Sequence, residues 1–385
     1  MSTLPSAFLP DVAEIIMGQS PPGDTYNEAS IGLPFFQGKT EFGEISPTPR
    51  KWCNAPKKIA EAGDILISVR APVGPTNLAS TQCCIGRGLA AIRANPKQLD
   101  PSYLRFALRH AEPRLASMGQ GSTFAAIGRA ELGKIEFPLP ALVEQHRIVD
   151  ILSRAEGIVR LRREAEKKAA DLIPALFLDM FGDPATNSKG WPEHRLGDIA
   201  EVVSGVTKGR KFGDKKTVVV PYLRVANVQE GHIDLTELKT IEVLPRDVAQ
   251  LTLQRGDVVM TEGGDFDKLG RGALWEQDIS DCIHQNHIFR VRLNQSLALP
   301  EFFVTYLLSG KTREYFLRCA KRTTNLASIN MTQLRGLPVV LPSMDVQHDF
   351  IEHFSAMRSI QSQQSAATVK AQGIFDALLA QVFHR

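Results

Sequence analysis

The hydrophobic and polar positions of this 385-residue chain predict two kinds of element: short buried strands and helices of two lengths. Short apolar runs that follow turn residues predict four strands, at residues 63–69, 88–93, 256–260 and 287–292. Patterns opened by proline predict two helices, at residues 101–110 and 300–309. Strands and helices therefore alternate in the same order in both halves of the chain.

Two longer stretches, of about 40 residues each, carry apolar residues at three- and four-residue steps and predict long helices of about 60 Å. The first follows Pro140 and the second follows Pro342. The apolar stripes include Ile148, Leu152, Ala155, Leu176, Phe350, Phe354, Met357 and Leu378. One such stripe is typical of a helix packed on its own domain, whereas two of equal length and register favour a helix pair.

Polar residues interrupt both stripes at equivalent positions, Arg162 in the first and Gln364 in the second. In an antiparallel pair these two side chains are expected to meet and to fix the register of the helices. Pro174 is expected to bend the first helix near its end, because proline lacks the amide hydrogen that a helix needs.

The chain is an internal repeat. Residues 9–16 are similar to residues 196–203, and Gly63-Asp64 is similar to Gly256-Asp257, at offsets of 187 and 193. From Ile127 onwards the offset stays at 202, so that Gln145 matches Gln347 and Phe181 matches Phe383. The C-terminal part of each repeat is thus held to one geometry, while the N-terminal part varies in loop length.

These patterns predict an α+β fold, with two mixed α/β domains in tandem, each followed by a long helix, and the two helices pairing as an antiparallel coiled coil. The expected boundaries are residues 1–140 for the first domain, 141–182 for its helix, 183–342 for the second domain and 343–385 for the last helix.

Two similar domains joined by two similar rods suit a DNA target with two separated half-sites. Because the domains differ in sequence, the half-sites are expected to differ too. A duplicated scaffold that binds two protein partners would have the same organisation, and so would a recognition subunit of another DNA-modification or phage-defence system. These alternatives stay open on the repeat alone.

Residues 137–149, FPLPALVEQHRIV, resemble the start of the helix in type I restriction–modification specificity subunits, with its proline pair and Glu-Gln. Residues 176–184 are similar to the usual end of that helix. Gly18-Gln19-Ser20-Pro21-Pro22 and Gly121-Ser122-Thr123-Phe124 resemble features of the target-recognition domains in this family. The second repeat departs from these motifs at Val346-Gln347 and at Thr323-Thr324-Asn325.

This resemblance implies a non-catalytic DNA-recognition subunit that reads an asymmetric bipartite site on double-stranded DNA. It also implies that the helix pair docks two methyltransferase subunits, which carry S-adenosylmethionine and methylate adenine. Two ATP- and Mg-dependent restriction–translocase subunits complete the restriction form. The family carries no cofactor in the recognition subunit itself.

The composition of the chain gives little support to DNA binding, and its low net charge counts against it. The net charge is only +3, and residues 1–140 hold 14 Lys and Arg against 12 Asp and Glu, so no strong basic field is present. A subunit that reads bases while its partners hold the phosphates needs fewer cations. The N-terminus lacks the pattern of a signal peptide and no apolar run is long enough to span a membrane, which predicts a cytoplasmic protein.

Candidate chemistry within the chain is weak. The five cysteines match no zinc spacing, so no metal is expected. Gly38-Lys39-Thr40 and Gly310-Lys311-Thr312 fail as phosphate loops, because Leu33 and Thr305 stand where such a loop needs glycine. No Asn/Asp-Pro-Pro-Tyr/Phe loop for amine methylation is present either. We therefore expect no catalytic site.

Bases are read by loop residues with hydrogen-bonding side chains. In the first domain the candidates for DNA contact are Ser20, Lys39, Arg70, Asn77, Gln82 and Arg87, with Ser122 and Thr123 for phosphate. In the second domain the candidates are Lys208, Lys211, Arg224, Asn227, Lys268, Arg271, Gln285, Asn286 and Asn325.

Overall fold

The computed structural model describes residues 5–119, 126–264, 269–322 and 327–383. The chain divides into two compact units. Unit 1 comprises residues 1–164 and 366–385, and unit 2 comprises residues 165–365, so each long helix contributes one part to either unit. Among the described residues, no helix is both long enough and apolar enough to cross a membrane.

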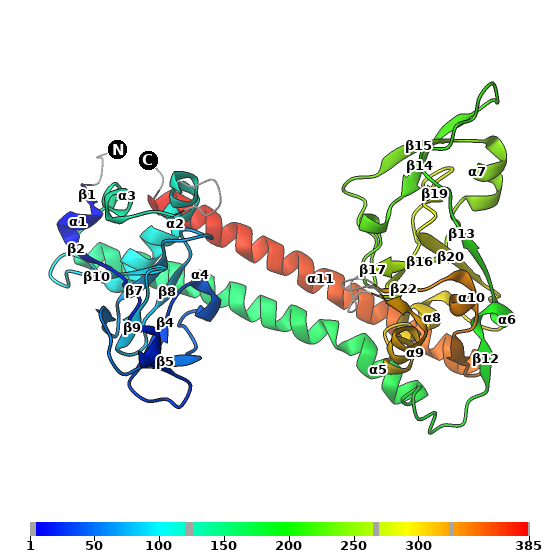
Figure 1. Ribbon diagram of the computed structural model, residues 1–385, viewed down its shortest axis with the longest axis horizontal. Helices are drawn as coiled ribbons and strands as arrows, with labels where there is room; N and C mark the ends of the chain where they lie inside the picture. The colour runs from blue at the N-terminus through cyan, green and yellow to red at the C-terminus, as the bar shows by residue number, and fades with distance from the viewer. Residues whose placement is uncertain (1–4, 120–125, 265–268, 323–326, 384–385) are drawn as a thin grey trace. The chain divides into compact units, whose positions relative to one another are not determined.

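Unit 1 contains two main sheets (Figure 1). The four-stranded sheet has the order β2 (Ala13–Met17), β10 (Leu89–Ala94), β7 (Ile65–Ser68), β8 (Thr76–Leu78). The five-stranded sheet has the order β3 (Tyr26–Asn27), β5 (Lys51–Cys53), β4 (Leu33–Phe36), β9 (Cys83–Ile85), β6 (Ile59–Ala60). The remaining elements are the pair β1 (Ser6–Phe8) and β11 (Glu136–Pro138), the helices α1 (Leu9–Val12), α2 (Pro101–Met118) and α3 (Arg129–Gly133), and the 3-10 turns η1 (Gly23–Thr25) and η2 (Lys39–Glu41).

Unit 2 repeats this plan. Its four-stranded sheet has the order β13 (Ala200–Ser204), β20 (Ile288–Leu293), β16 (Val258–Thr261), β18 (Gly272–Leu274). A second sheet has the order β15 (Lys239–Val243), β14 (Val218–Leu223), β19 (Ile283–His284), and a third has the order β17 (Gly263–Gly264), β22 (Ala327–Ser328), β21 (Lys321–Arg322). The remaining elements are β12 (Glu193–Arg195) with β23 (Pro338–Val340), the helices α6 (Leu196–Ile199), α7 (Pro245–Leu251), α8 (Pro300–Tyr306), α9 (Gly310–Cys319) and α10 (Met331–Arg335), and η3 (Val225–Asn227).

The same ion pair, in which the carboxylate is buried, joins two central strands in both units. Arg93 on β10 donates two hydrogen bonds to Asp64, at 2.9 and 2.8 Å, and Arg292 on β20 does the same to Asp257, at 2.7 and 2.8 Å. Both aspartates are buried, and each follows a glycine with positive φ. The four predicted strands and the predicted repeat are therefore confirmed, each strand within two residues of its expected bounds.

The first long helix is broken and the second is continuous. The first consists of α4 (Leu142–Ala170) and α5 (Leu172–Phe181), and the second is α11 (Met344–Phe383). Pro174 has no amide hydrogen to donate to the carbonyl of Ala170, the last residue of α4, which explains the break and confirms the predicted bend.

Within unit 2, α5 and the last turn of α4 run antiparallel to the first half of α11. Gln361 Nε2 donates to the carbonyl of Ala169 at 2.8 Å, and the Phe350 ring lies 6.0 Å from Phe177 and 5.1 Å from Phe181. As the residue number rises along one helix it falls along the other, which defines the antiparallel direction.

Within unit 1, the first part of α4 shares a hydrophobic cluster with the end of α11. Ile148 and Leu152 are buried there together with Phe375, and Arg163 donates to Gln372 Oε1 at 2.8 Å. A continuous coiled coil, and the meeting of Arg162 with Gln364, stay predictions because these two residues belong to different units.

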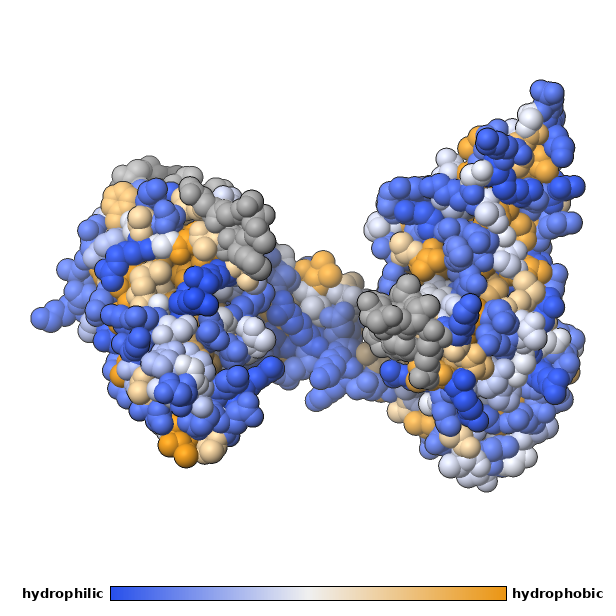
Figure 2. Space-filling view, in the orientation of Figure 1, coloured by the Kyte–Doolittle hydropathy of each residue, from blue (hydrophilic) through white to orange (hydrophobic). Residues whose placement is uncertain are grey.

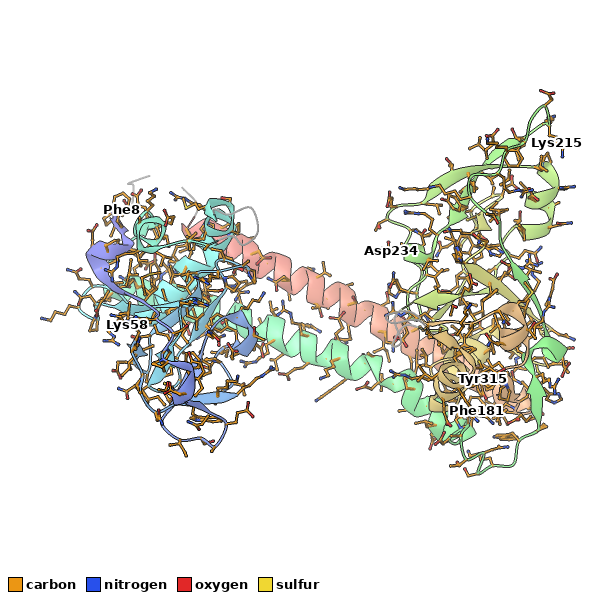
Figure 3. The ribbon with its side chains drawn as sticks, in the orientation of Figure 1. Phe8, Lys58, Phe181, Lys215, Asp234 and Tyr315 are labelled. Carbon is orange, nitrogen blue, oxygen red and sulfur yellow. The ribbon has the colours of Figure 1, made fainter. Side chains whose placement is uncertain are left out.

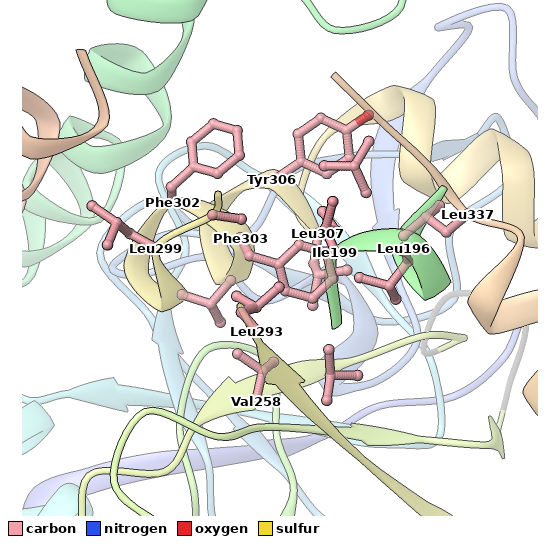
Figure 4. Packing of buried hydrophobic residues seen from close by; sticks show 14 of the residues in the cluster. Leu196, Ile199, Val258, Leu293, Leu299, Phe302, Phe303, Tyr306, Leu307 and Leu337 are labelled. Carbon is pink, nitrogen blue, oxygen red and sulfur yellow. The ribbon is translucent and has the colours of Figure 1, made fainter. Parts of the chain in front are cut away.

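Each unit has a large core between its four-stranded sheet and its helices. In unit 2 this cluster includes Val258 and Leu293 from the sheet and Phe302, Phe303 and Tyr306 from α8 (Figure 4). The visible face of each unit is mostly hydrophilic (Figure 2).

Candidate nucleic-acid interface

One tight turn in each unit connects the second sheet to the four-stranded sheet, and we call it the junction turn (residues 85–89 in unit 1). Its backbone is fixed by Gly86 N, which donates to Phe36 O at 2.8 Å, and by Leu89 N, which donates to Gly86 O at 3.0 Å. Gly18 crosses so closely that a Cβ atom there would lie 2.1 Å from Gly86 O. Only glycine fits at that crossing, because any side chain there would overlap the backbone of the turn.

The junction turn of unit 2, residues 284–288, has the same backbone hydrogen bonds. Gln285 N donates to Leu223 O at 3.0 Å, and Ile288 N donates to Gln285 O at 2.9 Å. Gly205 takes the place of Gly18, since a Cβ atom there would lie 1.9 Å from the His284 carbonyl oxygen. The two repeats thus present equivalent turns from equivalent scaffolds.

Four of the predicted contact residues of unit 1 gather around its junction turn. Arg87 is exposed on the turn, and its amide lies 3.5 Å from Ser20 Oγ. Val69 N donates to Gly88 O at 3.0 Å, which brings the next residue, the exposed Arg70, beside the turn. Lys39 is exposed on η2, which follows the Gln37–Gly38 backbone packed against Gly88.

Five of the predicted contact residues of unit 2 gather in the same way. Asn286 N donates to Val206 O at 2.9 Å, two residues before Lys208, and the carbonyl of Leu223 that binds Gln285 directly precedes Arg224. The neighbouring strand end brings Arg271, whose carbonyl accepts from Thr261 N at 2.9 Å. The set is therefore Lys208, Arg224, Arg271, Gln285 and Asn286.

The loop before β14 gives unit 2 a cationic edge that unit 1 does not share at the matching position. We call residues 207–217 the basic loop; it carries Lys208, Arg210, Lys211, Lys215 and Lys216 against Asp214. Lys215 is exposed at its tip (Figure 3), while Arg210 donates to Asp247 at 3.0 Å. Clustered exposed cations of this kind fit a phosphate backbone.

A carboxylate and an imidazole at the junction turn of unit 2, Glu262 and His287, were not among the residues predicted from the sequence. His287 follows Asn286 on the junction turn, and its Nδ1 lies 2.6 Å from Glu262 Oε2. Asn286 Nδ2 lies 3.4 Å from His287 Nε2. Only the position of His287 beside two selected residues could have pointed to the pair.

Two of the predicted contact residues are wrong, because their amides are buried. Asn77 is 2% exposed and donates to the Gly43 carbonyl at 2.9 Å. Asn227 is 3% exposed, accepts from Arg224 N and donates to the Asp234 carbonyl at 2.7 Å. Both side chains hold loops together and present nothing to a ligand.

The other predicted contacts fall into two groups. Gln82 is exposed but donates to Glu61 at 3.0 and 3.1 Å, apart from the residues gathered at the junction turn. Ser122, Thr123, Lys268 and Asn325 lie outside the described residues. Of the predicted helix-pair residues, Ile148, Leu152, Phe350 and Phe354 are buried, and Ala155, Leu176, Met357 and Leu378 are partly buried.

Three buried cysteine thiols in the two units are unreactive at neutral pH. Burial raises the pKa of the Cys83, Cys84 and Cys282 thiols to about 12, so these groups stay protonated at neutral pH. A thiol needs its thiolate form to act as a nucleophile or to bind a metal.

Comparison with known proteins agrees with the duplicated architecture. A relative from Methanocaldococcus jannaschii is 43% identical over 42% of this chain and 39% of its own length. The type I restriction enzyme EcoKI specificity subunit of Escherichia coli is 23% identical over 70% of this chain and 61% of its own length. The chain thus spans less than two thirds of either relative.

One solved structure matches along the whole chain. The type I restriction–modification S subunit from M. genitalium covers 100% of this chain and 96% of its own, with a TM-score of 0.57 and 16% identity, which shows a shared fold. Residues 4–169 and 188–369 match the family described as type I restriction modification DNA specificity domain. The chain therefore belongs to this family and contains two copies of its domain.

Proposed function

We propose that this chain is the DNA-reading subunit of a type I restriction–modification complex, with one half-site read by each unit. The observation that carries the proposal is the pair of junction turns, which share their backbone hydrogen bonds but present different side chains. Equivalent scaffolds with different exposed donors and acceptors suit a target whose two halves differ in sequence.

The two long helices have a separate role in this proposal. They set the distance between the two half-sites and dock the two methyltransferase subunits, with two restriction–translocase subunits joining in the restriction form. S-adenosylmethionine would then be held by the methyltransferases, and ATP and Mg by the restriction subunits. The chain itself binds and positions DNA without catalysis, in the cytoplasm.

Sequencing of methylated DNA from cells with and without this gene tests the proposal. Deletion should remove adenine methylation at one bipartite, asymmetric motif, and re-expression of the chain should restore it. The matched control is re-expression of Lys97→Ala, an exposed lysine that follows the end of β10 opposite the junction turn, which should restore the same motif. A methylome that is identical with and without the gene contradicts the proposal and favours a scaffold that binds no DNA.

A further inference from the structure

Arg87 and Asn286 stand at the same position of the two junction turns. Each follows the residue whose amide is bound by the preceding sheet, Gly86 in unit 1 and Gln285 in unit 2. Each precedes a residue whose carbonyl accepts from the end of the neighbouring strand, at 3.0 Å in both units. The two side chains therefore leave equivalent backbones, and they differ in chemistry rather than in placement.

We propose that Asn286 reads an adenine in the half-site of unit 2 and that Arg87 reads a guanine in the half-site of unit 1; this rests on the proposed function. The carboxamide of asparagine can accept from adenine N6 and donate to N7 in the major groove. The arginine guanidinium can donate two hydrogen bonds to guanine O6 and N7.

A hydrogen-bonded chain orients the Asn286 amide. Glu262 Oε2 lies 2.6 Å from His287 Nδ1. Since an ionised carboxylate can only accept, Nδ1 carries the hydrogen, and in the corresponding neutral tautomer Nε2 is an acceptor. Asn286 Nδ2, 3.4 Å from Nε2, donates to it. This contact uses one Nδ2 hydrogen and leaves the amide oxygen and the second Nδ2 hydrogen, which is the pair of groups that adenine requires.

Unit 1 has no such series of hydrogen bonds at the matching positions, and an arginine does not require one. Val69 and Gly88 occupy the positions of Glu262 and His287, as the matching backbone hydrogen bonds show. An amide has a donor end and an acceptor end and must be held the right way round, whereas every polar group of a guanidinium is a donor. Glu262 and His287 are thus positioning residues, and Asn286 contacts the base.

The test replaces the native gene with variants and reads the methylated motif. Asn286→Arg should change one base pair of one half-site from A·T to G·C, and Arg87→Asn should make the reverse change in the other half-site. Asn286→Asp, which has the same shape but cannot donate to N7, should lower the preference for A·T at that base pair roughly 5- to 150-fold.

The positioning residues need a readout that lost stability would not give. His287→Ala should weaken the preference at the same single base pair, and His287→Gln, which keeps an acceptor, should retain most of it. The unit 1 half-site should stay unchanged in every unit 2 variant, and the other base pairs of the unit 2 half-site should keep their preference, which shows that unit 2 of those variants folds.

The outcomes separate the two proposals. If the unchanged chain directs methylation of a bipartite motif but Asn286→Asp and Asn286→Arg leave every base preference as it was, the assignment of Asn286 is overturned. An equal loss of methylation on all sequences would make Asn286 a phosphate contact and would also overturn it. If the unchanged chain directs no methylation, the proposed function itself fails.

Discussion

Gln145 and Gln347 occupy equivalent positions in the two repeats. Each binds the backbone of two loops, the one directly before its own long helix and the one that follows β10 or β20. Gln145 is fully buried; its Nε2 donates to the carbonyls of Gln98 and Pro140 at 2.8 Å, and its Oε1 accepts from Asp100 N at 2.9 Å. Gln347 makes the matching three contacts with Leu297, Pro342 and Leu299. This clamp gives a structural reason for the glutamine in the motif that follows the proline pair.

Replacement of this glutamine by leucine should destabilise its unit by about 3 kcal/mol, because buried backbone groups lose their partners. Urea unfolding of the full chain with Gln347→Leu, followed by tryptophan fluorescence, measures the loss; Trp191 and Trp275 both lie in unit 2. Gln363→Ala on the exposed side of α11 is the control and should change little. Equal stability of the two variants would contradict the clamp.

His284 makes the stability of unit 2 sensitive to acid. Burial, with a smaller contribution from the nearby Arg290, lowers its pKa to about 4, against the opposing effect of the hydrogen bond that Nδ1 donates to the Ile288 carbonyl at 3.0 Å. The unfolded chain, with a pKa near 6.5, binds the proton more readily. Stability should therefore fall by up to about 3 kcal/mol as the pH drops from 6.5 to 4, measured by urea unfolding. In His284→Asn most of this dependence should vanish, whereas exposed His348→Asn should keep it.

Single residues show where prediction from sequence ends. The same feature, a polar side chain near a loop, predicts DNA contact for both Arg87 and Asn77, yet Arg87 is exposed and Asn77 is buried. The local sequence does not reveal the burial of Asn77, because this depends on the strand pairing that sets Asn77 of β8 opposite the buried Leu66 of β7. Glu262 lies 25 positions from His287 in sequence, so their contact depends on strand pairing that no local pattern reveals.

Elements were predicted more closely than residues, with exceptions that have local causes. The helix expected at 300–309 ends at Tyr306, and α9 begins anew because the Ser309 hydroxyl caps it by accepting from Thr312 N. The apparent phosphate loop at Gly310-Lys311-Thr312 is the start of this helix.

The basic loop carries the element-scale prediction. Lys211, Lys215 and Lys216 changed together to alanine should weaken DNA binding equally for all sequences. The slope of log affinity against log salt should fall by about 0.9 for each phosphate that the loop no longer neutralises. Titration of fluorescent duplexes at several salt concentrations measures the slope. Lys97→Ala with Lys134→Ala, two exposed lysines of unit 1, is the control. An unchanged slope in the triple variant would rule out phosphate binding by this loop.

At the scale of the whole molecule, the repeat carried the prediction furthest. Its constant offset of 202 predicted helices of equal length, and the structure places α5 and α11 antiparallel within unit 2. The first long helix is interrupted at Asp171, whereas α11 is continuous, so the two copies of the long helix differ in shape. The repeat does not give the distance between the proposed half-sites, which we propose the two long helices set together.

That distance can be changed by design. Deletion of residues 162–168 and their repeat equivalents, 364–370, removes one heptad from each helix, or about 10 Å. The apolar stripes return to nearly the same face, and the spacer of the methylated motif should shorten by about three base pairs. Deletion of five residues from each helix should instead abolish methylation, because it turns each stripe by about 140°. A heptad deletion that methylates the original spacer would show that the helices do not set the distance.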